Sequence, residues 1–241
     1  MLMARKPFPR DSVVPLEEGI LIPAGTLGLD EFRRWCEDER FPERGRIDYL
    51  QGDLEIDLSP EELFTHGTAK SSIGARLHAL IVERGLGFVF IDRARVVSPA
   101  AGLSVEPDVV VVLRDSIASG RVRLVPSSRR AGRYVELEGA PDLVVEIVSD
   151  ASVSKDRDRL PRLYAQAGVP ELWLADARGD VPLLEIRALG RAGYARVAPD
   201  GPAPKNAEGW TRSPLLGRRF RLRRREVRDP ELVYHELETR P

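Results

Sequence analysis

The sequence contains few of the residues that most often mark a metal or redox site. Among its 241 residues there are one cysteine and three histidines, and neither type shows the spacing of a zinc site. The lone Cys36 cannot form an internal disulfide, and in Phe32-Arg-Arg-Trp-Cys36 it fits a small buried hydrophobe better than a nucleophile. There is also no internal repeat and no glycine-rich phosphate-binding motif. These absences argue against disulfide scaffolds, zinc enzymes and P-loop enzymes.

Long hydrophobic runs are missing as well. No apolar stretch approaches the ~18 residues that a membrane helix needs, and Met1–Pro7 lacks the apolar core of a secretory signal. We therefore expect a cytoplasmic protein with no membrane partner.

A charge excess of one sign is the third absence. Lys and Arg total 37 against 38 Asp and Glu, which gives a net charge of -1. The whole chain therefore does not attract nucleic acid, and such a partner would need a local basic patch.

The length and composition favour a single domain. A chain of 241 residues with 42% hydrophobic residues can bury one large core. Residues 1–29 are rich in Pro and Gly and show no sustained periodicity, which is typical of an arm on the surface. We expect the domain over residues 30–225, followed by a C-terminal extension over 226–241.

Two short apolar runs organise the rest of the chain. Glu106–Leu113 and Ala140–Ser149 both contain Pro-Asp followed by β-branched residues, which predicts strands buried on both faces of a sheet. Glu146 lies inside the second run, where an ionised carboxylate needs a partner or a metal. If the runs pair antiparallel, Asp108 approaches Glu146, while Asp142 falls roughly 13 Å away at about 3.4 Å per residue.

The remaining elements predict an α/β protein. The sequence indicates a short helix from Leu29, a hairpin over Arg46–Leu50 and Asp53–Leu58 with its acids on a solvated face, and a helix that starts at the capping box Ser59–Glu62 and ends near Gly85. Strand 142–148, an amphipathic helix that ends at Gly168, and strand 171–176 have the length of a crossover unit. We therefore expect a central mixed sheet with a parallel part.

His66 and Lys70 lie at helical spacing beside the apolar stripe of the predicted helix. His66 is placed to contact a phosphate or a metal-bound water, and an ordinary helix histidine explains it equally well.

Arginine is concentrated in two segments. The polar insertion 114–134 contains five arginines between residues 121 and 133, and the tail 218–228 predicts a strand with arginines on its outer face. Both segments are suited to contact phosphates, although a solvated loop and a basic surface strand are the plain alternatives.

The paired carboxylates suit phosphodiester hydrolysis. This reaction requires a divalent cation that neutralises developing charge and lowers the pKa of its water, and Mg²⁺ prefers carboxylate oxygens. Asp108 and Glu146 supply such oxygens. A nearby lysine can orient the nucleophile or stabilise the transition state, and Lys155, nine residues after Glu146, is the candidate.

Taken together, several motifs resemble the PD-(D/E)XK nuclease superfamily and, within it, the Uma-two family of restriction-endonuclease-like proteins. The similar segments cover most of residues 45–225 and comprise the hairpin, Ser59–His66, Glu106–Asp108, Gly139–Ser149, Tyr164–Leu174 and Ser213–Phe220.

The resemblance implies a restriction-endonuclease-like core, with a central mixed β-sheet flanked by α-helices. It also implies Asp108 and Glu146 as ligands of Mg²⁺, with Mn²⁺ as a substitute, and a main-chain carbonyl near Ile147 as a third ligand. The superfamily lysine stands two residues after the acid, where this chain has Val148. We therefore propose Lys155 as its replacement.

Three functions remain open from the sequence. The first is a Mg²⁺-dependent endonuclease that acts on DNA, with a homodimer as one compatible assembly. The second is a non-catalytic nucleic-acid-binding or assembly module that retains the nuclease fold. The third is a hydrolase that uses Asp108 and Glu146 as acid and base, as glycosidases do, although the 6% aromatic content provides little surface for binding a sugar.

Overall fold

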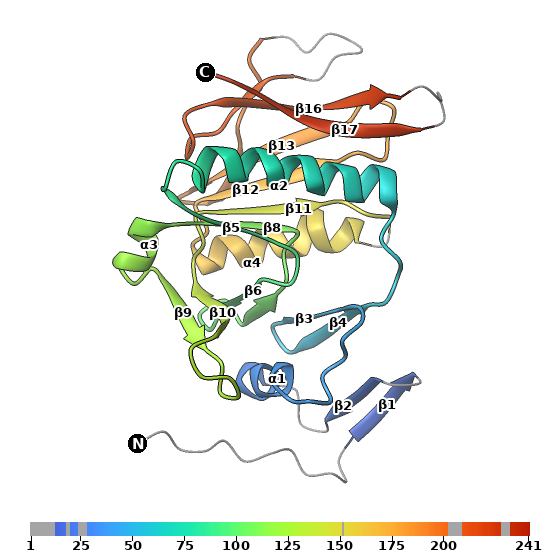
Figure 1. The fold of residues 1–241 in the computed structure, drawn as a ribbon, viewed down its shortest axis with the longest axis vertical. Coiled ribbons are helices and arrows are strands. Elements are labelled where there is room, and N and C mark those ends of the chain that lie inside the picture. The colour runs from blue at the N-terminus through green and yellow to red at the C-terminus, as the bar shows by residue number, and fades with distance from the viewer. Residues whose placement is uncertain (1–12, 18–19, 24–27, 151, 202–208, 228–231) are drawn as a thin grey trace.

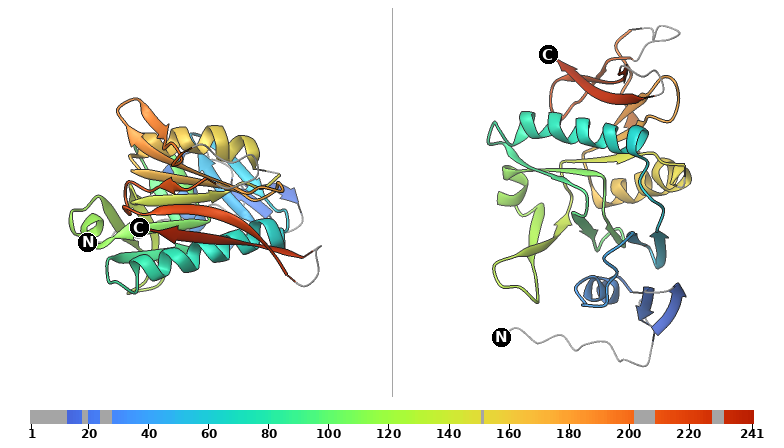
Figure 2. Two further views of the ribbon diagram at one scale, coloured as in Figure 1. Left: turned by 90° about the horizontal axis from the view of Figure 1, so that it is seen from above. Right: turned by 45° about the vertical axis from the view of Figure 1, so that its right-hand side comes forward.

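The computed structural model describes residues 13–17, 20–23, 28–150, 152–201, 209–227 and 232–241. Two six-stranded sheets, a three-stranded sheet and a two-stranded hairpin make up its β-structure. The long helix α2 (Thr68–Ile81) and the shorter α4 (Leu160–Ala167) lie on opposite sides of the central sheet (Figures 1 and 2). The expected mixed sheet flanked by helices is confirmed.

The central sheet has one parallel pair of strands, and its other neighbouring strands are antiparallel. Its order is β14 (Gly193–Arg196), β13 (Leu183–Gly190), β12 (Glu171–Asp176), β11 (Leu143–Ile147), β8 (Val109–Leu113) and β5 (Gly87–Ile91). The two Pro-Asp runs form β8 and β11, which are antiparallel neighbours with Val145 opposite Val109. This register continues to Glu146 and Asp108, as predicted.

The parallel pair β11 and β12 is joined by a helical crossover. The chain leaves β11 and enters a π-helical turn, η2 (Lys155–Arg159), which leads directly into α4. Gly168 ends α4 with a φ of 82°, a left-handed conformation in which glycine has no steric penalty. The crossover packs α4 against one face of the sheet through Leu160, Leu163 and Tyr164.

The opposite face of the central sheet is covered by α2 and by the C-terminal strands. Ile73 and Leu77 of α2 share one buried cluster with Phe220 and Leu237. The three-stranded sheet has the order β15 (Thr211–Arg212), β16 (Arg219–Glu226), β17 (Val233–Arg240). Half of the segment expected as an extension over 226–241 thus lies in β17, which pairs with β16 and contacts α2.

The second large sheet packs against α4 and the central sheet. Its order is β4 (Asp53–Asp57), β3 (Arg46–Leu50), β7 (Leu103–Val105), β6 (Arg95–Ser98), β10 (Tyr134–Gly139) and β9 (Val122–Pro126). Its residues Leu103 and Val105 join the buried cluster of α4. Helix α1 (Leu29–Cys36) packs against this sheet through Phe32 and Trp35, and β1 (Val13–Glu17) pairs with β2 (Ile20–Pro23) at the lower end of Figure 1.

One alternative is excluded and one local prediction was wrong. The polar insertion 114–134 is not the solvated loop that was its plain alternative, because it forms helix α3 (Arg114–Ala118) and strand β9. The helix expected from Ser59 begins later, with the π-helical turn η1 (Leu63–Gly67), and ends at Ile81.

The cap of this helix explains the later start. Glu62, not Ser59, accepts hydrogen bonds from the main-chain N–H groups of the first turn, including that of Phe64 at 3.0 Å. Burial would raise the pKa of Glu62, but these bonds lower it to about 2. An ionised carboxylate at a helix N-terminus is a stronger acceptor than a serine hydroxyl. Ser59 instead donates its main-chain N–H to Asp57 at 2.9 Å.

Within the described residues, no helix is both long enough and apolar enough to cross a membrane.

Asp142, the acid of the second Pro-Asp motif, has a structural role that mutation can test. Its buried carboxylate accepts hydrogen bonds from Leu113 N at 2.8 Å and Ser116 Oγ at 2.7 Å, and it also pairs with Arg121. We expect Asp142→Ala to lower the free energy of unfolding by about 2–4 kcal/mol, because these donors lose their acceptor. Urea unfolding measures the change.

Asp115→Ala is the matched control, since Asp115 is exposed on α3, and its effect should stay within about 0.5 kcal/mol. Equal stability of the two variants would contradict a structural role for Asp142.

Candidate active site

A cleft of about 540 Å³ opens where β8 begins and β11 ends. Its walls come from the start of β3, the segment before η1, the β5–β6 turn and the entrance of η2. Among the lining residues are four cations and a histidine, namely Arg46, Lys70, Arg93, Lys155 and His66. Ile147, the last residue of β11, also lines the cleft.

Asp108 lies directly behind this lining and is only 1% exposed. Its Oδ1 is 2.7 Å from Arg46 Nη2, and its Oδ2 accepts the main-chain N–H of Ile147 at 2.8 Å. His66 Nε2 is 3.5 Å from Oδ2. The strand register produces the contact with Ile147, because antiparallel pairing places the residue before β8 beside the end of β11.

Asp108 remains ionised in this environment. Burial would raise its pKa, but the hydrogen bond from His66 and the charges of Arg46 and His66 outweigh burial and hold the pKa well below its usual range.

The pKa of Glu146 is shifted in the opposite direction from that of Asp108. It is 2% exposed, and its Oε1 accepts a hydrogen bond from the hydroxyl of Tyr164 on α4. Burial, followed by the negative charges of Asp108 and Asp156, raises the pKa of Glu146 well above its usual value. Burial and Glu146 also raise the pKa of Tyr164, so this phenol stays protonated as the donor. The negative charges of Asp108 and Asp156 thus favour the protonated form of Glu146, and they would equally favour a cation bound beside it.

Asp156, on η2, is a third buried acid of the group. It is 2% exposed and accepts a hydrogen bond from Ser152 Oγ. Burial raises its pKa to about 6, although the hydrogen bond from Ser152 and the charge of Lys155 act in the opposite direction.

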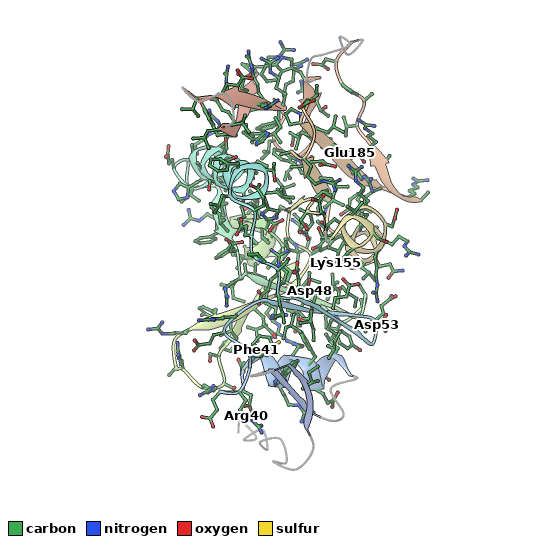
Figure 3. All side chains as sticks on the ribbon, turned by 90° about the vertical axis from the view of Figure 1, so that its right-hand side faces the viewer. Arg40, Phe41, Asp48, Asp53, Lys155 and Glu185 are labelled. Atoms are coloured by element: carbon green, nitrogen blue, oxygen red, sulfur yellow. The ribbon has the colours of Figure 1, made fainter. Side chains whose placement is uncertain are left out.

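Lys155 lies between the two large sheets, next to Asp48 (Figure 3). Its Nζ is 3.1 Å from Asp48 Oδ2, and its side chain is 10% exposed. Asp48 is itself held by the main-chain N–H of Glu106 at 3.1 Å. Burial would lower the pKa of Lys155, but the charges of Asp48, Glu146 and Asp156 raise it. Lys155 is therefore an ammonium at neutral pH.

His66 bridges two carboxylates on the other side of the cleft. Its Nδ1 is 2.9 Å from Glu61 and its Nε2 faces Asp108. Burial would lower the pKa of His66, but the hydrogen bond to Asp108 raises it. Lys70 contacts the same Glu61 at 2.6 Å and also Asp92 at 2.8 Å. The side chains of His66 and Lys70 are thus joined through Glu61.

The rim of the cleft contains a strained turn. Asp92 and Arg93, between β5 and β6, have φ angles of 55° and 52°, which side chains other than glycine adopt at a cost. The N–H of Asp92 donates to Asp108 O at 3.1 Å, and Arg93 donates to Glu43 O at 2.7 Å. The turn therefore places an exposed arginine beside the buried acids.

All four predicted catalytic side chains surround this one region. Asp108 and Glu146 are adjacent across two strands, and His66 and Lys155 approach from opposite walls. Val148 occupies the usual lysine position in the sequence and is a buried core residue.

Four residues of this region, Arg46, Asp48, Asp156 and Tyr164, were not predicted from the sequence as site residues. Arg46 and Asp48 alternate on strand β3, whose residues from 47 to 50 are all buried. The charge of Asp48 within this buried strand could have marked it as a site residue. The partners of Arg46 and Asp48, which are Asp108 and Lys155, lie on other elements and could not be predicted from the strand itself.

The arginine-rich segments lie differently from what the sequence suggested. Arg121 pairs with Asp142, four residues before Glu146 at the opposite end of β11, and Arg123 pairs with Glu138. On β16, Arg221 and Arg225 face Glu238 and Glu236 of β17 at 2.6 and 2.8 Å. Much of this basic charge is therefore neutralised within the fold.

The oxygen atoms of this site are of the kind that a hard divalent cation binds. Asp108 and Glu146 offer oxygens beside one another, and their mutual repulsion is the kind that a cation relieves. In the part of the chain that the structure describes, no three His, Cys, Asp or Glu side chains form a metal-ligand group. Two neighbouring carboxylates would leave the other positions of such a cation to water.

Comparisons with known proteins identify the family and the fold of the chain. A family model, Uma2, described as "Putative restriction endonuclease", matches residues 29–214. A solved structure described as a putative nuclease belonging to DUF820, from Anabaena variabilis, is similar in fold with a TM-score of 0.51 and 19% sequence identity. The match covers 75% of this chain and 90% of that chain. No curated protein matches. The restriction-endonuclease-like α/β fold is thereby confirmed.

The raised pKa of Asp156 predicts a pH-dependent stability. Because the folded state holds the proton up to a pH of about 6, Asp156 contributes stability that is present below pH 3.8 and is lost as the pH rises through 6. Asp156→Asn stays neutral and avoids this loss. Between pH 4 and 7.5 the variant should gain on the order of 2–3 kcal/mol relative to wild type.

Urea unfolding of both proteins at the two pH values measures this gain. A stability difference between the two proteins that does not change with pH would contradict the assignment.

Proposed function

Because the chain belongs to the Uma2 family of restriction-endonuclease-like proteins, we propose that it is a metal-dependent endonuclease that hydrolyses phosphodiester bonds in DNA. The main support is the juxtaposition of two buried carboxylates, Asp108 and Glu146, with the ammonium of Lys155 beside a cleft whose lining mixes cations and acids. A divalent cation, when bound, supplies an activated water and neutralises charge on the phosphate.

Asp108, Glu146 and the main-chain carbonyl of Ile147 would hold this cation. Asp108 is already ionised, because its pKa is lowered. Glu146 would serve as a ligand in its deprotonated form, since thermodynamic linkage couples cation binding to deprotonation.

Lys155 has the role of a fixed positive charge. Its raised pKa keeps the ammonium protonated, so it stabilises the negative charge that develops on the phosphate and does not act as a base. Asp48 orients the ammonium. His66 orients Asp108 from the opposite wall through its Nε2.

The cleft lining favours a phosphate-containing substrate over a sugar. The lining residues, all within the described part of the chain, include no Phe, Tyr or Trp. A glycosidase would need such rings for stacking, whereas a phosphate needs paired cations, and the lining offers four of them among six acidic side chains.

A second candidate function is a nucleic-acid-binding module without catalysis. It is favoured by Val148 at the usual lysine position and by the ion pair that holds Lys155 on Asp48. Metal titration discriminates between the two functions. Binding of Mg²⁺ or Mn²⁺ without cleavage of any nucleic acid would favour the module.

Nicking of supercoiled plasmid in Mg²⁺ tests the endonuclease. Asp108→Asn and Glu146→Gln should each lower the rate by at least about 10³-fold, because each removes a cation ligand. Lys155→Ala should lower it by about 10²-fold through loss of one stabilising charge. Asp115→Ala, on the surface of α3, is the control and should cleave at the wild-type rate.

EDTA should stop the reaction. Cleavage that is lost in Glu146→Gln but unchanged in Lys155→Ala would remove Lys155 from the mechanism. Wild-type protein that binds metal and never cleaves would overturn the endonuclease itself.

Arg93 offers a test of DNA binding at the rim. Arg93→Gly removes a charge that we expect to contact a phosphate, and it also relieves the left-handed backbone. The variant should bind a DNA duplex more weakly, with a salt slope smaller by about 0.9. Its free energy of unfolding should stay the same or rise by up to about 1 kcal/mol.

Fluorescence anisotropy across a series of salt concentrations measures the binding. Arg130→Ala, in the β9–β10 loop outside the cleft lining, is the control. An identical salt slope in wild type and Arg93→Gly would contradict the contact.

A further inference from the structure

Arg46 lies between the buried acids and the open cleft. Its side chain is 26% exposed and lines the cleft, whereas its partner Asp108 is 1% exposed and does not. The guanidinium is 2.7 Å from Asp108 Oδ1. A cation that approaches Asp108 from the cleft therefore meets Arg46 first.

The charges around Arg46 are those that a divalent cation would face. Its charge interacts with Asp108, Glu146 and Asp48, in that order of strength. Asp108 Oδ2 is already used by the N–H of Ile147 and faces His66, so Oδ1 is the oxygen most suited to a metal. That oxygen is the one Arg46 occupies. Two cations on a single carboxylate oxygen repel each other strongly in a buried site.

The open cleft provides a second position for the guanidinium of Arg46. Arg46 is the first residue of β3, and its neighbours Gly45, Asp57 and Ser59 line the same cleft. A small rotation of the long side chain would move its head from Asp108 into the space where a phosphate would bind. Arginine binds phosphate as readily as carboxylate, with the same planar set of donors.

We propose that Arg46 is a displaceable counter-cation. It neutralises Asp108 while the site holds no metal, leaves when a divalent cation binds, and then contacts a phosphate of the nucleic acid. This inference rests on the proposed function. It adds that cation binding and nucleic-acid binding strengthen each other through one side chain.

Mn²⁺ binding, measured by isothermal titration calorimetry without nucleic acid, tests the displacement. Arg46→Met keeps the length of the side chain but removes its charge, and it should bind Mn²⁺ at least 10-fold more tightly than wild type. Arg130→Met is the control, because Arg130 is an exposed cation in the β9–β10 loop, outside the cleft lining. Its affinity should stay at the wild-type value, since salt screens a distant exposed charge. Arg46→Met that binds Mn²⁺ no more tightly than Arg130→Met overturns the proposal.

Wild-type protein provides a second measurement in case Arg46→Met does not fold. The side-chain Nε–Hε NMR signal of Arg46, assigned by its loss in Arg46→Lys, should shift as Mg²⁺ saturates the site. An unchanged signal at saturation would show that the ion pair with Asp108 is static, and it would overturn the displacement.

Binding of a DNA duplex with and without Ca²⁺ tests the second half of the proposal. Arg46→Met should weaken binding about 10-fold in Ca²⁺ and by less than 3-fold without it, since only the released guanidinium reaches a phosphate. Equal losses in the two conditions would overturn this coupling. Failure of the endonuclease is separate, because it would appear as metal binding without plasmid nicking in wild type.

Discussion

The antiparallel pairing of β8 and β11 is the constraint on which the site depends. Its register sets Val145 opposite Val109, and the next step along each strand places Glu146 beside Asp108. Both acids are then fixed by main-chain hydrogen bonds of a fully buried pair of strands, not by flexible loops. A slip by one residue would turn the side chains of one strand to the opposite face, so the hydrophobic core of the sheet and the geometry of the site require the same register.

Burial of several acids at one point creates the need for cations. Asp108, Glu146, Asp156 and Asp48 are each about 1–2% exposed, and water cannot stabilise their charges. Strand β3 supplies Arg46 and the helical turn η2 supplies Lys155. Tyr164 is uncharged and donates a hydrogen bond to Glu146. A carboxyl group with a raised pKa remains in spite of these partners, which is the condition in which a further cation is most strongly attracted.

The two Pro-Asp motifs show that similar sequences can have different roles. Asp108 precedes β8 at the cleft, whereas Asp142 precedes β11 at the opposite end of the sheet. Asp142 accepts hydrogen bonds from Leu113 and Ser116 and pairs with Arg121, so it organises the connection between β8 and β9. Antiparallel pairing causes this difference, because the starts of two antiparallel strands lie at opposite edges of the sheet.

The sequence by itself determined that the two Pro-Asp runs form buried strands, and antiparallel pairing of those strands was the one condition for the proximity of Asp108 to Glu146. Apolar runs of β-branched residues specify buried strands, and an acid within such a run stands out because its burial costs free energy. Lys155 could be proposed from the sequence, but only the tertiary structure showed that Arg46 pairs with Asp108 and that Asp48 holds Lys155. Arg46 and Asp48 come from a separate sheet, about 60 residues or more before Asp108 and Glu146 in the chain. Contacts between elements that are distant in sequence depend on how the layers pack, and no local pattern of residues records that packing.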